Sequence, residues 1–250
     1  MQLLAFLLAA IGLAAQPAIA SLRVNPLIIY LQPSSTGSSQ VIELTNVTDI
    51  ELPFEVNVIK RTVVDGAEVP VAADDDFVIF PPQMIIAPGA TQTLRVQFLP
   101  AAELTQSESY YIYVTQVPVE LRPGMSGIRV NYRFGISAHV TPSGVKPDVQ
   151  VAAFERGTDD KGRQGYDVTV ANAGSRFVRL SEEGLAIPGG PTWNKEEIKE
   201  AIGTAFMLPG QTKRYFIADE PGAVAADTAV IEDAVIEAAE TASQDKSEKL

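Results

Sequence analysis

Short apolar stretches separated by turn residues fill the chain from Ser21 to about Pro142. In one of them, Phe54, Val56 and Val58 alternate with polar neighbours. Alternation with a period of two, in stretches rich in valine, isoleucine, tyrosine and phenylalanine, is typical of half-buried strands. Turn signals recur about every 8–12 residues, which predicts a β-sandwich. The expected strands cover residues 27–31, 41–44, 54–59, 77–80, 92–98, 110–117 and 128–140.

The same pattern restarts after Pro147. Strands are expected at 149–154, 166–170, 177–180 and 212–217, and a short helix is expected at 194–201. Two segments of the first half are echoed in the second. The Ala-Pro-Gly turn at 87–89 resembles Leu-Pro-Gly at 208–210, and Leu-Thr-Asn at 44–46 resembles Val-Ala-Asn at 170–172. The two pairs repeat at a similar offset, as two successive sandwiches of one topology would.

We therefore expect an all-β chain of two immunoglobulin-like β-sandwich domains in tandem, with a short acidic C-terminal tail. The expected boundaries are 21–142 and 143–222, with a hinge at 141–147 where Pro142, Gly144 and Pro147 interrupt any strand. Residues 223–250 are rich in alanine and acidic side chains and form the tail. Their weak amphipathic pattern leaves two interpretations open, a disordered tail and a weakly helical one.

The first twenty residues predict a signal peptide. The apolar run from Leu3 to Ala15 is shorter than the ~20 residues of a membrane span, and Ala18-Ile19-Ala20 fits the small-residue cleavage pattern. No basic residue precedes the run, which departs from the usual signal peptide. We expect an exported protein whose mature chain starts at Ser21, without membrane insertion.

Charge and composition narrow the class of partner. The sequence contains 19 lysines and arginines against 31 aspartates and glutamates, for a formal net charge of −12. Binding to nucleic acids or anionic membrane surfaces needs a basic footprint, so no nucleic-acid partner is expected. Cysteine is absent, so disulfides and thiolate chemistry are not expected either.

The residues that usually carry catalysis are sparse. The single histidine, His139, falls in an expected strand and has no second histidine to share a metal or a proton. The run Asp74-Asp75-Asp76 lacks the ligand spacing of a calcium loop and is interpreted as the opening of a strand. No serine has a general base nearby in the sequence. We expect no catalytic residue, no metal site and no cofactor, and hence a binding protein rather than an enzyme.

The segment from Gly127 to Ser137 has the longest regular alternation. Its apolar side chains point to one face of a strand and its polar side chains to the other, over five apolar positions. A sandwich strand that buries one face in its own core explains this pattern. A strand that offers this face to a partner explains it too, because the segment directly precedes the expected hinge.

Three segments together resemble a known family. They are Phe77-Val78-Ile79-Phe80-Pro81-Pro82 through Ala87-Pro88-Gly89-x-x-Gln92-x-x-Arg95-Val96, Glu108-Ser109-Tyr110-Tyr111 through Val117-Pro118, and Gly127-Ile128-Arg129-Val130 through Val140-x-Pro142. In their order and spacing they resemble the periplasmic pilus chaperones, the PapD-like family, and within it the divergent archaic branch. The resemblance covers about residues 22–220 and is weaker in the second half.

The resemblance implies a fold and a function. Members of this family have two sandwich domains and bind pilin subunits whose own sandwich lacks its last strand. The chaperone donates the last strand of its first domain to the open groove and delivers the subunit to an outer-membrane usher. Pilins and an usher are thus the implied partners, the periplasm is the implied location, and self-association is a way for the free chaperone to cover its donor strand. By motif, the donated side chains are Ile128, Val130, Tyr132 and Phe134.

The resemblance fails at the residues that hold the C-terminal carboxylate of the subunit. The best-known members use an arginine on the first strand and a lysine near the end of the donated strand, but these positions hold Leu27 and Ser137. The family's interdomain arginine falls on Thr141, whereas its glutamate partner matches Glu108. Either no carboxylate is clamped, or another cation binds it.

Two arginines are candidates for that other cation. Arg95 belongs to the Gln92-x-x-Arg95 motif, and Arg133 belongs to the alternating segment. Both are equally compatible with ordinary solvated arginines on strands.

Three other classes of protein compete with this interpretation. A pilus or adhesin subunit would lack one strand and carry a free N-terminal donor segment, whereas this chain is strand-like from Leu22 onward. A carbohydrate-binding module would favour exposed aromatic residues, but the one tryptophan, Trp193, lies outside the segments that carry the resemblance. A hydrolase is disfavoured because a general base is missing.

Overall fold

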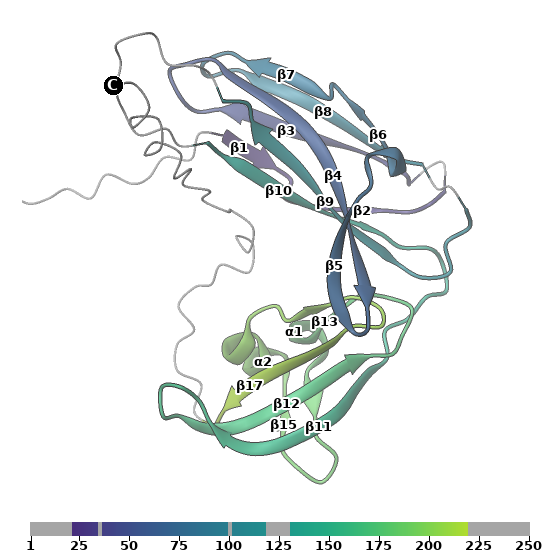
Figure 1. The fold of residues 1–250 in the computed structure, drawn as a ribbon, viewed down its shortest axis with the longest axis vertical. Helices are drawn as coiled ribbons and strands as arrows, with labels where there is room; N and C mark the ends of the chain where they lie inside the picture. The colour runs from purple at the N-terminus through teal and green to yellow at the C-terminus, as the bar shows by residue number, and fades with distance from the viewer. Residues whose placement is uncertain (1–21, 35–36, 100–101, 119–130, 220–250) are drawn as a thin grey trace, which may run out of the picture.

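The computed structural model describes residues 22–34, 37–99, 102–118 and 131–219, and it has two β-domains set at an angle (Figure 1). The first domain is a sandwich of two sheets. Sheet A has the strand order β1-β3-β8-β6, and sheet B the order β2-β10-β9-β4-β5, with β7 pairing to β4. The strands of sheet A are β1 (Leu22–Asn25), β3 (Ser39–Asn46), β8 (Thr91–Phe98) and β6 (Phe77–Phe80). Those of sheet B are β2 (Ile28–Leu31), β10 (Arg133–Val140), β9 (Glu108–Gln116), β4 (Leu52–Val64), β5 (Ala67–Ala72) and β7 (Gln83–Ile86).

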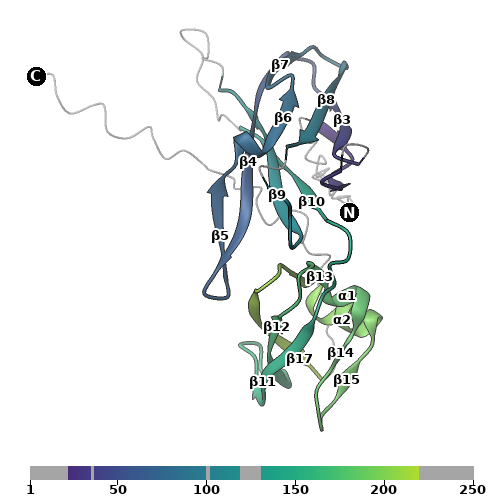
Figure 2. The same cartoon turned by 90° about the vertical axis from the view of Figure 1, so that its right-hand side faces the viewer.

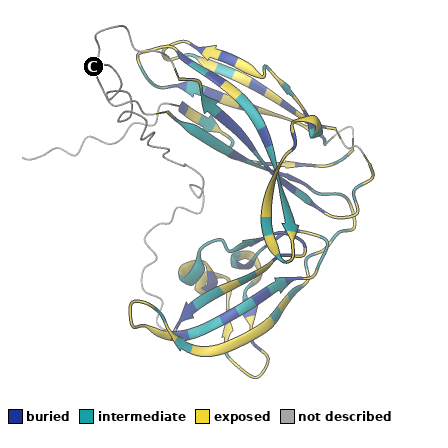
Figure 3. Ribbon diagram, in the orientation of Figure 1, coloured by how far each residue is buried: buried dark blue, intermediate teal, exposed yellow. Residues whose placement is uncertain are grey.

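The core of the first domain comes from the alternating positions that the sequence indicated. Leu94 and Val96 of β8 face Ile112 and Val114 of β9, and all four side chains are fully buried. Along β8, buried positions alternate with exposed ones, whereas β9 has only buried and intermediate positions (Figure 3). Burying each such side chain stabilises the fold by about 1.5–3 kcal/mol. The run Asp74–Asp76 forms one 3-10 turn, η1, directly before β6.

A long hairpin formed by β4 and β5 extends from the first domain toward the second (Figure 2). Its tip is the turn at Asp65 and Gly66, which both have positive φ angles of 51° and 78°. At the tip, Thr212 N donates to the carbonyl of Gly66 across 2.9 Å. The hairpin therefore connects sheet B directly to the second domain.

The second domain has one well-formed sheet and a layer of short elements. Sheet C has the order β11-β12-β17, formed by β11 (Val149–Thr158), β12 (Gln164–Asn172) and β17 (Thr212–Ala218). Covering it are the strand pairs β13 (Val178–Arg179) with β16 (Phe206–Met207) and β14 (Leu185–Ala186) with β15 (Thr192–Trp193), and the helices α1 (Leu180–Glu183) and α2 (Lys195–Ile202). The helix expected at 194–201 is thus confirmed. The strand expected at 177–180 is wrong in its last residue, because Leu180 begins α1 instead.

The start of α2 is explained by its cap. The side chain of Asn194 accepts a hydrogen bond from Glu197 N, and the Glu197 side chain accepts one from Asn194 N. This capping box satisfies two backbone donors that the first turn of a helix leaves free. The helix buries Ile198 in the core of the second domain, against Val168 and Val170 of sheet C.

The sequence echoes correspond to one structural motif that occurs in both domains. In the first domain, Gly89 N donates to the carbonyl of Asn46 at the end of β3. In the second, Gly210 N donates to the carbonyl of Asn172 at the end of β12. Both asparagines are fully buried. The repeated short sequences therefore form the same hydrogen-bonded turn in both domains, although the strand orders of the two domains differ.

Aromatic rings fill the junction between the domains. His139 of β10 lies with its ring centroid 4.6 Å from Phe177 and 5.0 Å from Phe206, both in the second domain. Two hydrogen bonds close the junction nearby: Ser107 N donates to the Ser175 carbonyl, and Phe177 N donates to Ser107 Oγ, each at 2.8 Å. Around His139, the domains thus meet through stacked rings and neutral hydrogen bonds.

Within the described residues, no helix has the length and apolar character needed to cross a bilayer. Nor do they contain a group of three or more histidine, aspartate or glutamate side chains that could hold a metal ion.

Candidate functional site

The described part of the expected donor strand has one open side. β10 pairs with β9 over its whole length, whereas β2 pairs only with its last four residues, from Ser137 to Val140. Among the residues that the structure describes, no strand flanks the first half of β10 on its outer side. A strand with an unpaired side can add a further strand to its sheet.

Backbone hydrogen bonds show which groups of β10 point to the open side. Gln116 N donates to the carbonyl of Tyr132 at 2.8 Å, on the β9 side. On the opposite side, Ser137 N donates to the carbonyl of Leu27 at 2.9 Å. Because the N–H and C=O of one residue point the same way in an antiparallel ladder and alternate along the strand, those of Arg133 point to the open side.

The donor side chains that the structure describes lie on the core-facing side of β10. Tyr132 and Phe134 are half-buried, and their stacked rings lie 6.1 Å apart. Ile136, next in the same row, is fully buried. The apolar row therefore emerges from the core toward the start of the strand. The other two predicted donor residues, Ile128 and Val130, lie outside the described residues.

On the outer face of sheet B, Arg133 lies over an aromatic ladder. Its guanidinium carbon is 3.6 Å from the centre of the Tyr113 ring. The lack of a side chain at Gly135 makes room for this ring, because a Cβ there would come within 3.2 Å of it. The ladder continues to Tyr111, 5.6 Å from Tyr113, and to Arg61, 4.5 Å from Tyr111. The Nε atom of Arg133 is buried and meets no hydrogen-bond acceptor in the described part of the chain.

The second predicted anchor, Arg95, lies elsewhere. It is exposed on β8 of sheet A, in register with Val41 on one side and Phe80 on the other. Its neighbours Leu94 and Val96 face the core, so Arg95 points away from it. Arg95 and Arg133 are therefore on different sheets, and the fold does not bring them together.

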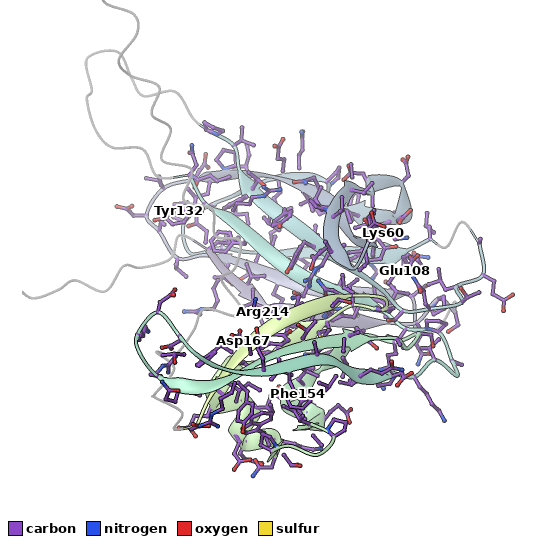
Figure 4. The ribbon with its side chains drawn as sticks, turned by 60° about the horizontal axis from the view of Figure 1, so that its bottom comes forward. Lys60, Glu108, Tyr132, Phe154, Asp167 and Arg214 are labelled. Carbon is purple, nitrogen blue, oxygen red and sulfur yellow. The ribbon has the colours of Figure 1, made fainter. Side chains whose placement is uncertain are left out.

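Glu108 lies where the first domain meets the second. It pairs with Lys60, and its carboxylate and that of Asp76 both lie within hydrogen-bond distance of the Tyr110 hydroxyl, whose single proton they share. Burial, together with the charges of Glu108 and Asp76, raises the pKa of Tyr110 far above its usual range. Lys60 and Glu108 line a cleft with residues 208–210, at the opposite end of sheet B from Tyr132 (Figure 4). Glu108 thus lines a cleft with residues of the second domain, and the cation paired with it is Lys60 of its own domain.

A second cleft between the domains contains two arginines that the sequence analysis did not single out. It has a volume of about 500 Å³, and its lining includes Tyr30, Thr141, Arg176, Arg179 and Glu182. Arg179 donates to the Tyr30 hydroxyl at 2.7 Å and contacts Glu182 at 3.5 Å. No sequence motif marks these arginines. They come to lie beside Tyr30 of the first domain only because the two domains pack against each other.

Comparison with known proteins places this fold in a family. Residues 22–146 match the family described as pili and flagellar-assembly chaperones, PapD N-terminal domain. The match spans half of the chain. The protein belongs to this family of pilus-assembly chaperones. A comparison with curated protein sequences finds no match.

Several solved structures share the fold. A chain in the crystal structure of the CsuC–CsuE chaperone–tip adhesion subunit complex, from the archaic Csu pili of Acinetobacter baumannii, is 14% identical with a TM-score of 0.52, covering 78% of this chain and 90% of that one. A chain in the complex of the Salmonella enterica SafA pilin with the SafB chaperone is 12% identical with a TM-score of 0.51, covering 80% and 86%. The class 5 fimbriae chaperone CfaA is 13% identical with a TM-score of 0.50, covering 80% and 87%.

These findings establish the class of protein. The family model and the two-domain β-sandwich identify a PapD-like pilus-assembly chaperone. The chain is accordingly a chaperone and not an enzyme, as the sequence analysis predicted.

Proposed function

We propose that this protein is a periplasmic chaperone that binds a pilin subunit by donating a strand to its incomplete sandwich. On this proposal the mature chain starts at Ser21, with domains at 21–142 and 143–222 and the tail at 223–250. The observation that carries the proposal is the open side of β10 in a member of the pilus-chaperone family. A subunit strand can pair with the open backbone groups of β10.

The donated side chains are Ile128, Val130, Tyr132 and Phe134. Each would contribute about 1.5–3 kcal/mol on full burial in the groove of the subunit, less the cost of ordering the partners. Tyr132 and Phe134 support this role because they are only half-buried in the free protein. An open strand with an apolar row also favours self-association of the free chaperone.

If a cation holds a carboxylate of the subunit beside the donor strand, we assign this role to Arg133 rather than Arg95. Arg133 belongs to the open half of β10, and its Nε atom has no acceptor among the described residues. Arg95 points away from the core on the other sheet. A charge-assisted hydrogen bond to a carboxylate would satisfy the buried donor of Arg133.

We further propose that the chaperone delivers the subunit to an outer-membrane usher through the outer face of sheet A. Three apolar side chains are exposed there around Arg95: Phe80 at 70%, Val78 at 49% and Val41 at 44%. Since this face belongs to the other sheet, a second partner could bind it while a subunit occupies β10. Contiguous exposed apolar residues often mark protein-binding surfaces.

Substitution of Val130 by aspartate tests strand donation. A carboxylate there would have to enter the apolar groove of the subunit, where its desolvation costs several kcal/mol. The expected result is a protein with nearly unchanged melting temperature that no longer retains pilin in pull-downs from periplasmic extract. Ile136→Asp is the control, because Ile136 is fully buried and this change should unfold the first domain. A collapsed melting temperature for Val130→Asp would instead mean that this row serves only the chaperone's own core.

A further inference from the structure

The cleft that contains Arg176 and Arg179 is positively charged within an acidic protein. Arg176 is exposed, and no carboxylate of the described residues forms an ion pair with it. The side chain of Arg179 is only 12% exposed, whereas its partner Glu182 is 60% exposed at a long separation of 3.5 Å. Glu182 thus offsets one of the two arginine charges from the solvent side, and the lining of the cleft keeps an excess of positive charge.

The positive charge of Arg179 also acts on the neighbouring His139. Burial, together with the positive charges of Arg179 and Arg61, lowers the pKa of His139 to about 3. The imidazole therefore stays neutral at the junction, and the charge of the cleft comes from its arginines and Glu182 alone. The cleft favours an anionic occupant that can reach it.

The chain itself carries a suitable anion. Residues 220–250 include eight acidic and two basic side chains, a net charge of −6, which is half of the −12 of the whole sequence. Four of the acidic residues are close together: Glu232, Asp233, Glu237 and Glu240. Complementary charge attracts this segment to the arginines of the cleft.

The segment is also long enough to reach the cleft. β17 starts at the domain junction, where Thr212 N bonds to Gly66, and its seven residues span ~24 Å. Glu232 comes 13 residues after Asp219, and that length can extend over ~43 Å. Because the segment is tethered, its effective concentration at the cleft is on the order of millimolar.

We propose that the acidic segment 223–250 occupies the interdomain cleft of Arg176 and Arg179 when no partner protein is bound. The segment keeps the two arginines paired, and an incoming anionic partner has to displace it. This inference concerns the free protein and does not depend on strand donation.

A spin label tests the proposal on the full-length protein. Since the sequence has no cysteine, Ala238→Cys gives a single attachment site for a nitroxide. Asp219 N bonds to the Gln164 carbonyl, so the segment leaves the fold beside the β11–β12 turn that contains Gly162. With the segment in the cleft, the label broadens the amide NMR signals of Thr141 and Ser143 more than that of Gly162, and high salt reverses this order. Stronger broadening at Gly162 at every salt concentration would overturn the proposal.

Matched arginine variants identify the site. Arg176→Gln in the labelled protein should restore most of the lost Thr141 and Ser143 signal, and adding Arg179→Gln should restore the rest. Arg95→Gln, which removes an exposed arginine from sheet A, should change nothing. Because Arg179 also bonds to Tyr30, the exposed Arg176 variant alone decides the outcome if the double variant unfolds. Equal broadening in wild type and Arg176→Gln would contradict the assignment.

Discussion

Asn46 and Asn172 perform the same task in the two domains. The amide nitrogen of Asn46 donates to the carbonyls of Ile50 and Ile86, at 2.7 and 2.9 Å. That of Asn172 donates to the carbonyls of Arg176 and Leu208, at 2.8 and 3.2 Å. Each buried side chain thereby connects the end of its own strand to a residue just before a Pro-Gly turn, Ile86 in the first domain and Leu208 in the second.

Removing either amide should destabilise its own domain. Asn46→Ala leaves two carbonyls without their donor, which costs about 1–3 kcal/mol for each one that stays buried. The expected result in calorimetry is a lower melting temperature for the first domain, with the second little changed. Asn172→Ala should have the reverse effect. Thr93→Ala, at an exposed position of β8, is the control and should leave both transitions in place.

A pair of substitutions at Arg133 distinguishes the contribution of its backbone N–H to pilin binding from that of its guanidinium. Both Arg133→Ala and Arg133→Pro remove the guanidinium, but only proline removes the N–H that points to the open side of β10. Proline is tolerated at such an edge, so both variants should stay folded. If β10 pairs with a subunit strand, Arg133→Pro should retain much less pilin than Arg133→Ala in quantitative pull-downs.

The comparison with wild type then tests the anchor. A carboxylate held by Arg133 predicts that Arg133→Ala alone already weakens capture sharply, because truncating one partner of a buried charge pair costs about 3–5 kcal/mol. Arg95→Ala should capture pilin normally. Equal capture by wild type, the alanine variant and the proline variant would argue against both roles of Arg133.

The proposed usher surface can be probed with small changes on exposed strands. The double variant Val41→Ser and Val78→Ser removes apolar area from the outer face of sheet A. We expect normal melting and normal pilin capture, with weaker binding to the isolated usher in surface plasmon resonance. Val71→Ser on β5, 47% exposed, is the matched control and should bind the usher normally. An unchanged affinity of the double variant would place usher binding elsewhere.

His139 should make the protein sensitive to acid. Its pKa is lowered to about 3 in the folded state, chiefly by burial, against 6.5 in the unfolded chain. The unfolded state therefore binds the proton first, and the free energy of unfolding falls as the pH drops from 6.5 toward 3, by up to about 1.4 kcal/mol per pH unit. Above pH 6.5 this group contributes no pH dependence.

The variant His139→Phe measures this contribution. It keeps an aromatic ring against Phe177 and Phe206 but removes the titrating group and the 2.9 Å hydrogen bond to Ser109. Urea titrations between pH 4 and 7 should give a flatter pH dependence for the variant than for wild type, since all other titrating groups are common to both. Parallel curves would show that the imidazole is not the source.

The sequence predicted those features that local pattern determines. Alternation located the strands around Phe54 and Val168, and the repeated Pro-Gly turns indicated a second β-domain. The side chains of Asn194 and Glu197 close a helix cap within four residues, so α2 was predictable as well. Each of these features depends on neighbours in the chain.

Features that depend on packing between distant segments were missed. His139 looked like an isolated strand histidine, yet it forms the centre of the domain junction because Phe177 and Phe206 come to it from the second domain. Arg176 and Arg179 carry no motif, and only the angle between the domains brings Arg179 to Tyr30, 149 residues away in the sequence. The strand predicted through Leu180 turns into α1, since Gly184 N donates back to the Leu180 carbonyl.

The aromatic junction also determines how the domain angle responds to the solvent. Interactions between exposed charges weaken over a Debye length of about 8 Å at physiological ionic strength, whereas stacked rings and neutral hydrogen bonds are hardly screened. His139, Phe177 and the Ser107–Ser175 bond carry no net charge. This aromatic part of the junction should therefore hold the angle between the domains nearly constant when the ionic strength of the surrounding medium rises or falls.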